Sequence, residues 1–212
     1  NGELRLIEST NLGAGADDIL TLSDGVNNVI AGLGADIINV GGGRNFVHGD
    51  EGKLEVLVDG SDRTLISTLN ATAGNPDDMD EIEIGAGFNV VVGGAARDVI
   101  NVKGTAVAAR SSIIGDNGKI TLQTSSAVLL SIESSDFGFG GEDKIHLTTG
   151  TNVVIAGNGD DSITAQAGIN VILGDDGRAE FYTDGSLRLI ESINLGTGGD
   201  DIIALSDGIN NV

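Results

Sequence analysis

The chain has 212 residues, of which 32 are acidic and 11 are basic, and its formal net charge is −21. This charge repels nucleic acid and anionic membrane surfaces and favours cations, so neither of the first two is an expected partner. Cysteine is absent, which excludes disulfides and thiolate metal sites, and no apolar run is long enough for membrane insertion as a helix.

The sequence of the chain contains a long repeat. Residues 1–29 return as residues 184–212, an offset of 183 positions at which 21 of the 29 residues are identical. A chain built from such repeats predicts a stacked architecture and not an enzyme with one active site.

A shorter period lies inside the long one. The motif Gly-Asp-x-Gly occurs at residues 49–52, 115–118 and 174–177, where the chain changes from a glycine-rich texture to a strand-like one. We therefore expect four segments, of which the last is equivalent to the beginning of the first: residues 1–52, 53–118, 119–177 and 178–212.

Each unit contains a nonapeptide pattern. Asp18, Asn27, Asp36 and Asn45 follow one another at intervals of nine residues, and an aliphatic residue stands two positions after each. Nine residues hold one short strand and one tight turn, for which glycine supplies the backbone freedom. Two nonapeptides make one coil, so residues 18 apart should stack about 4.8 Å apart. The predicted fold is an all-β parallel β-roll or β-solenoid.

This stacking predicts one edge of aspartates and one edge of asparagines. The expected stacked pairs are Asp18 with Asp36, Asp80 with Asp98, Asp143 with Asp161, Asn27 with Asn45, and Asn152 with Asn170. Two carboxylates at this spacing repel by roughly 3.5 kcal/mol at an effective dielectric constant of about 20. Calcium, which takes about six to eight oxygen ligands in irregular geometry, would relieve the repulsion at neutral pH.

Two segments carry a family resemblance. AGLGADIIN (residues 31–39) and AGNGDDSIT (residues 156–164) resemble the G-G-x-G-x-D-x-U-x repeat of the RTX, or hemolysin-type calcium-binding, family. The resemblance implies a β-roll in which Asp side chains and carbonyls of the glycine turns hold Ca²⁺ between coils. Together with the stacking, it assigns these residues to metal: Asp18, Asp36, Asp50, Asp80, Asp98, Asp116, Asp143, Asp161, Asp175, Asp201, Gly32, Gly34, Gly157 and Gly159.

The second unit departs from the pattern. Ala96 stands where Gly34 and Gly159 stand in the other units, and Val107 falls where the spacing predicts an asparagine. The asparagine edge can offer calcium only amide oxygens, so a structural asparagine ladder is the favoured interpretation there.

A different texture follows each Gly-Asp-x-Gly motif. Residues 53–72, 119–134 and 178–195 each contain two strand-like runs around a turn, which predicts either hairpins or wider coils that continue the stack. Asp50, Asp116 and Asp175 lie in the connecting turns, where they either complete a calcium site or cap the turn. The two histidines, His48 and His146, occupy unrelated repeat positions and are expected on the surface.

The expected function is structural. The resemblance implies a calcium-binding repeat segment of a long secreted or cell-surface bacterial protein or extracellular filament, which folds and stiffens on meeting extracellular calcium. Besides calcium, the expected partner is the chain itself. Copies could associate end-to-end or laterally into a fibre, because solenoid ends expose unpaired strand edges. The alternatives are a ligand-binding adhesin or matrix module and the non-catalytic secretion tail of a hydrolase.

Overall fold

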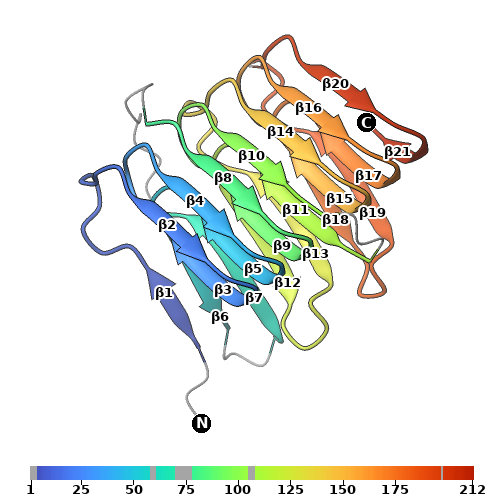
Figure 1. The fold of residues 1–212 in the computed structure, drawn as a ribbon. Helices are drawn as coiled ribbons and strands as arrows, with labels where there is room; N and C mark the ends of the chain where they lie inside the picture. The colour runs from blue at the N-terminus through green and yellow to red at the C-terminus, as the bar shows by residue number, and fades with distance from the viewer. Residues whose placement is uncertain (1–3, 58–60, 70–77, 105–107, 197) are drawn as a thin grey trace.

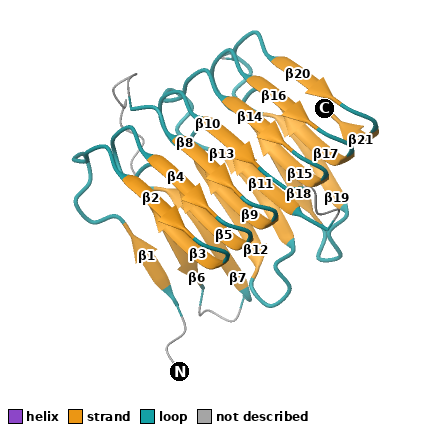
Figure 2. Cartoon of the chain, viewed as in Figure 1, coloured by secondary structure: helices purple, strands orange, loops and turns teal. Residues whose placement is uncertain are grey.

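The computed structural model describes residues 4–57, 61–69, 78–104, 108–196 and 198–212. In these ranges it contains 21 strands in three seven-stranded sheets (Figures 1 and 2). The described residues form no helix, and so none that could span a membrane.

Two of the sheets are parallel and together form a roll. The first, the outer sheet, contains β2 (Ile19–Leu22), β4 (Ile37–Val40), β8 (Glu81–Ile84), β10 (Val99–Val102), β14 (Lys144–Leu147), β16 (Ser162–Ala165) and β20 (Ile202–Leu205). The second, the central sheet, contains β3 (Gly25–Ile30), β5 (Gly43–His48), β9 (Gly87–Val92), β11 (Arg110–Ile114), β15 (Gly150–Ile155), β17 (Gly168–Leu173) and β21 (Gly208–Asn211). The prediction of an all-β chain with parallel sheets is confirmed.

The third sheet, the hairpin sheet, is antiparallel. It contains β1 (Leu6–Glu8), β6 (Gly52–Val56), β7 (Arg63–Thr68), β12 (Gly118–Gln123), β13 (Leu129–Ser134), β18 (Gly177–Phe181) and β19 (Leu187–Ser192). The segments after Gly-Asp-x-Gly are therefore hairpins, not wider coils: β6 pairs with β7, β12 with β13 and β18 with β19. Each unit makes two coils of the roll and then adds one hairpin.

The central sheet is buried on both faces. Figure 1 shows the outer sheet on one side of it and the hairpin sheet on the other. Ile38, Ile100 and Val154 belong to the core between the outer and central sheets, whereas Val92 and Ile120 belong to the core between the central and hairpin sheets. This explains the uninterrupted apolar runs of β9 and β15, because a strand covered on both faces has no polar side to alternate with.

The asparagine edge is a hydrogen-bonded ladder. Asn27 donates its amide to Asn45 Oδ1, and Asn152 donates to Asn170 Oδ1, both at 2.9 Å. The same amide nitrogens also donate to backbone carbonyls four residues earlier. The predicted stacking is confirmed, and because these amide oxygens already accept a bond from the previous coil, the ladder supports a structural role.

The second unit interrupts this asparagine ladder, but not at the residue that the spacing predicts. Ser111 pairs in register with Asn89 on one side and Asn152 on the other, so it takes the asparagine position. The sequence had placed Val107 there, and that residue lies outside the described residues. The connection between β10 and β11 is longer than its counterparts, which moves the strand by four positions relative to the regular spacing.

Ala96 has the backbone conformation of the glycines it replaces. Its φ is 78°, and Gly34 and Gly159 have φ values of 131° and 144°. A side chain in the left-handed region costs about 1–2 kcal/mol.

We expect Ala96→Gly to raise the free energy of unfolding by about 1 kcal/mol, because relief of this strain exceeds the entropy that glycine adds to the unfolded chain. Urea denaturation measures the change. Ala95→Gly, at a buried neighbour whose φ is not positive, should instead destabilise the protein. Equal effects of the two substitutions would contradict the prediction.

Only one of the two histidines lies on the surface, where both were expected. His146 is exposed, but His48 is buried in the central sheet, where Val92 stands beside it in register. Burial lowers the pKa of His48 to about 4. The surface assignment of His48 was wrong because β5 is covered by the hairpin sheet as well as by the outer sheet.

Both ends of the structure show how consecutive repeats join. β1 corresponds to β19 at the offset of 183 residues, and it pairs with β6 in the antiparallel manner in which β13 pairs with β18. At the other end, β20 and β21 correspond to β2 and β3, and they stack on β16 and β17 in the same parallel register that the inner coils use. The 183-residue repeat therefore continues the three sheets without a break.

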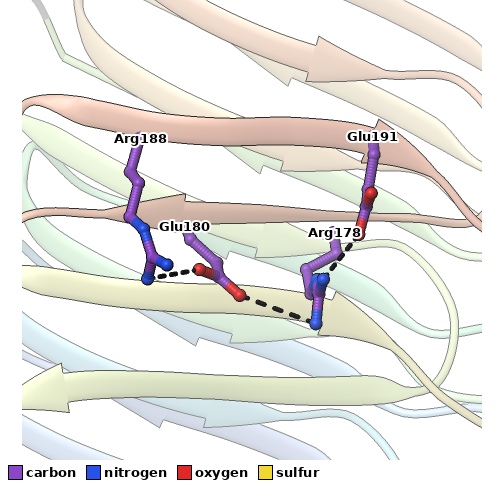
Figure 3. Close-up of polar contacts among 4 residues, drawn as sticks. All are labelled: Arg178, Glu180, Arg188 and Glu191. Atoms are coloured by element: carbon purple, nitrogen blue, oxygen red, sulfur yellow. Dashed lines mark hydrogen bonds and ion pairs between the residues drawn. The ribbon is translucent and has the colours of Figure 1, made fainter.

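The solvent face of the hairpin sheet carries charges in register. Arg178 forms an ion pair with Glu191 at 2.6 Å, and Arg188 forms one with Glu180 at 2.8 Å (Figure 3). The residues that follow one another directly across the seven strands are Glu8, Lys53, Ser67, Lys119, Glu133, Arg178 and Glu191. Exposed ion pairs of this kind contribute only about 0–1 kcal/mol each to stability. The row therefore helps to fix the pairing register of the strands more than it stabilises the fold.

Candidate metal centre

The aspartate edge is a continuous ladder along the roll. Each member is the residue directly before a strand of the outer sheet, and the members in spatial order are Asp18, Asp36, Asp80, Asp98, Asp143, Asp161 and Asp201. The backbone amide of each one donates to Oδ1 of the next, at 2.7–3.0 Å. The three predicted stacked pairs are confirmed, and the structure joins them into one row.

Four of the five inner members of the ladder have one carboxylate oxygen without a hydrogen-bond partner. Asp36, Asp98, Asp143 and Asp161 are at most 1% exposed, and Oδ2 of each is buried with no hydrogen-bond partner. A buried carboxylate oxygen without a donor is costly because it has lost its hydration. Either a proton or a cation at this oxygen removes that cost.

Backbone carbonyls approach the same unpartnered oxygens. A Cβ added to Gly115 would collide with both Asp143 Oδ2 and the carbonyl oxygen of Ala156. A Cβ added to Gly93 would collide with both Asp98 Oδ2 and the carbonyl oxygen of Gly115. Carboxylate and carbonyl oxygens are the ligands that calcium takes in proteins, and here both kinds lie against the same glycines, where a side chain would not fit.

The aspartates of the hairpin turns lie beside the ladder. Asp50 Oδ2 accepts the amide of Ala95 at 2.6 Å, and Asp116 accepts the amides of Gly141 and Asn158. Asp175 accepts the amide of Gly199. These bonds reach into the glycine turns of the following coils, so each hairpin-turn aspartate fixes the next turn and does not simply cap its own.

Electrostatics couple the two rows. Burial, with repulsion from neighbouring carboxylates, raises the pKa of Asp36 to about 6, of Asp50 to about 7 and of Asp161 to about 7. Burial and repulsion from Asp98 raise the pKa of Asp80 to about 10. Burial likewise raises the pKa values of Asp98, Asp116 and Asp143 well above the usual range, and that of Asp201 to a lesser degree.

The glycines assigned to the site form its turns. Gly32, Gly34, Gly157 and Gly159 all have positive φ, between 107° and 144°. At Gly159 a Cβ would also collide with the carbonyl of Gly141 in the adjacent coil. The turns thus depend on glycine twice, for their backbone conformation and for the close stacking of coils.

The structure brings the assigned aspartates together to different degrees. Asp18 is exposed and Asp201 is half-buried at the two ends of the ladder, whereas the five between them are buried. Asp176, which spacing arguments did not select, is also buried and accepts the amide of Asn194. In the part of the chain that the structure describes, no three acidic or histidine side chains converge into a closed metal cage. The candidate metal ligands are instead single carboxylate oxygens in a line, with backbone carbonyls beside them.

The chain matches no known family model, and no curated protein or solved structure is significantly similar to it. The fold and the edge described above define its class: an all-β repeat protein with two parallel roll sheets, a third sheet of hairpins and a buried acidic edge.

Proposed function

We propose that the chain is a calcium-binding structural segment of a long repeat protein of the RTX-like β-roll type, secreted or displayed at the cell surface. The observation that carries the proposal is the row of buried carboxylate oxygens without donors along the aspartate edge. Such a row opposes folding at neutral pH unless positive charge reaches it. Bound calcium would supply that charge.

The residues that would hold calcium are the ladder aspartates, with the carbonyls beside Gly93 and Gly115. Asp98 and Asp143 are central, since both are fully buried and both face a carbonyl. Their Oδ1 atoms hold the coil stack through the amides of the preceding coils, which leaves Oδ2 for the cation. Calcium suits such a set better than magnesium, which retains its waters and demands octahedral geometry.

A structural role also follows from how the repeats join. The registers at β1 and at β20–β21 let the 183-residue repeat continue all three sheets, so a longer array would be a rod with three continuous layers. Stacking of separate copies would use the same open strand edges. The row of charges that runs from Glu8 to Glu191 would continue in register in either arrangement.

Thermal unfolding followed by far-UV circular dichroism tests the proposal. The chain is stripped of metal and melted in metal-free buffer, in millimolar calcium and in millimolar magnesium. One site with calcium 100-fold above its dissociation constant adds about 2.7 kcal/mol, and about 2–4 °C of Tm accompanies each kcal/mol in a chain of this size. We expect a rise in Tm of ten degrees or more with calcium, on the order of two occupied sites, and little with magnesium. An unchanged Tm in calcium would overturn the proposal.

A further inference from the structure

A cavity of about 390 Å³ lies between the central sheet and the tips of two hairpins. Phe88, Val153 and Val171 line it from the central sheet, and Leu129, Phe181 and Leu187 line it from the β12–β13 and β18–β19 hairpins. Phe88 and Arg110 stand at the starts of β9 and β11, whereas the turns that lead to the aspartate edge follow the other ends of these strands, so the cavity is separate from that edge.

Ser112 contributes to the space there. It pairs in register with Val90 on one side and with Val153 on the other, so a small residue replaces valine in the middle of an apolar row. Ser112 is 6% exposed and lines the cavity. At this position of the row β11 thus has a smaller side chain than the strand on either side of it.

The rim of the cavity carries a positive charge. Arg110 lines it, is exposed, and has no hydrogen bond or ion pair with any described residue. On the other side of Phe88 in register is Arg44, whose guanidinium lies 5.0 Å from the ring centre of Phe46 and 5.6 Å from that of Phe88. Two of the 11 basic residues of a chain with net charge −21 thus flank one aromatic ring.

The acidic residue at the cavity is already engaged. Asp184 Oδ1 accepts both the backbone amide and the hydroxyl of Ser186, at 2.9 and 2.6 Å, within its own hairpin turn. These bonds lower the pKa of Asp184. Asp184 therefore remains a carboxylate that is bound within its own turn, and Arg110 is the cationic group at the rim that can donate hydrogen bonds to a ligand.

We infer that this cavity binds a small organic anion with an apolar body. The anionic group would pair with Arg110, and the body would pack against Phe88, Val171 and Leu187. The volume falls within the range of about 300–1,000 Å³ that small-molecule sites occupy, and apolar side chains with a small number of polar and charged groups among them are their usual lining. This inference is independent of calcium binding at the aspartate edge.

Two fluorescent probes test the inference on the intact chain. 8-Anilinonaphthalene-1-sulfonate carries an aromatic body and an anion, and N-phenyl-1-naphthylamine has the same body without the charge. We expect saturable binding of the sulfonate with one site per chain, and weaker binding of the neutral probe. Arg110→Gln should weaken sulfonate binding about tenfold, the equivalent of one charge-assisted hydrogen bond, and should leave the neutral probe unaffected.

Arg97→Gln is the matched control, since Arg97 is exposed and the structure gives its side chain one hydrogen bond among the described residues, to the Met79 sulfur at 3.7 Å. Ser112→Leu should narrow the cavity and weaken binding of both probes, and Ser112→Val, which matches the adjacent valines, should weaken both to a smaller degree while keeping Tm unchanged or higher. Circular dichroism confirms the fold of each variant. Equal sulfonate affinity in the Arg110 and Arg97 variants, or undiminished binding in a folded Ser112 variant, would overturn the inference.

Discussion

In metal-free buffer, the free energy of unfolding should fall as the pH rises from about 5 to about 8. The folded-state pKa values of Asp36, Asp50 and Asp161 are raised to about 6, 7 and 7 from an ordinary value of 3.8. Between these limits the folded state keeps protons that the unfolded chain has released. The stability they represent is complete below the unfolded pKa and is lost as the pH rises through the folded values, by about 1.4 kcal/mol per pH unit for each carboxyl.

A carboxylate whose pKa is lowered by pairing gives the opposite slope, because its contribution is lost on acidification, so the sign is diagnostic. His48 contributes in the other direction: its pKa is lowered to about 4, so its contribution is complete above its unfolded value of 6.5 and is lost on acidification. Urea denaturation at several pH values, with calcium present in a parallel series, measures both trends. Calcium should flatten the slope, and a stability that rises from about pH 5 to about pH 8 without metal would contradict the protonated edge.

Asp98→Asn, or equally Asp143→Asn, should stabilise the chain without calcium and reduce the stabilisation that calcium gives. The amide oxygen can accept the amide of Asp80 as Oδ1 does now, and the amide nitrogen can donate to the carbonyl beside Gly93. Without metal near neutral pH, the variant should therefore be more stable by about 1–3 kcal/mol, because a buried oxygen without a donor is removed. In calcium, the same variant should gain less Tm than the wild type, because one carboxylate ligand is lost.

Asp207→Asn is the control for this experiment. It makes the same change of charge at an exposed residue on the opposite edge, for which the structure gives no hydrogen bond among the described residues. Its melting curves should follow the wild type in both buffers. Destabilisation by Asp98→Asn in metal-free buffer would show that the carboxylate is stabilised there by a partner other than a proton or a cation.

The aspartate and asparagine rows could be predicted from spacing alone. A period of nine residues, with an aliphatic residue two positions after each Asp or Asn, is enough to place Asp98 beside Asp80 and Asn170 beside Asn152, as the hydrogen bonds confirm. Links between units were not predictable in this way. Asp98 meets Asp143 across 45 positions, because the intervening hairpin leaves the roll and returns to it.

The second hydrophobic core was also beyond the sequence pattern. Alternation in β2 and β4 indicates one buried face, and nothing local to β9 or β15 says which element covers their second face. The same gap led to the wrong surface assignment of His48. The insertion before β11 shifted the asparagine position to Ser111, which a regular period cannot anticipate.

Local chemistry thus determined the strands, the glycine turns and the stacking of like side chains, because a short-period repeat places equivalent residues at equal heights in every coil. Tertiary structure decided the burial and the hydrogen-bond partners of those side chains. The docking of the hairpin sheet buries the second face of the central sheet and fixes Asp50 and Asp116 against the glycine turns of later coils. The spacing places the carboxylates in a row, but only the packing of coils and hairpins removes their water and leaves Oδ2 of Asp98 and Asp143 without a donor.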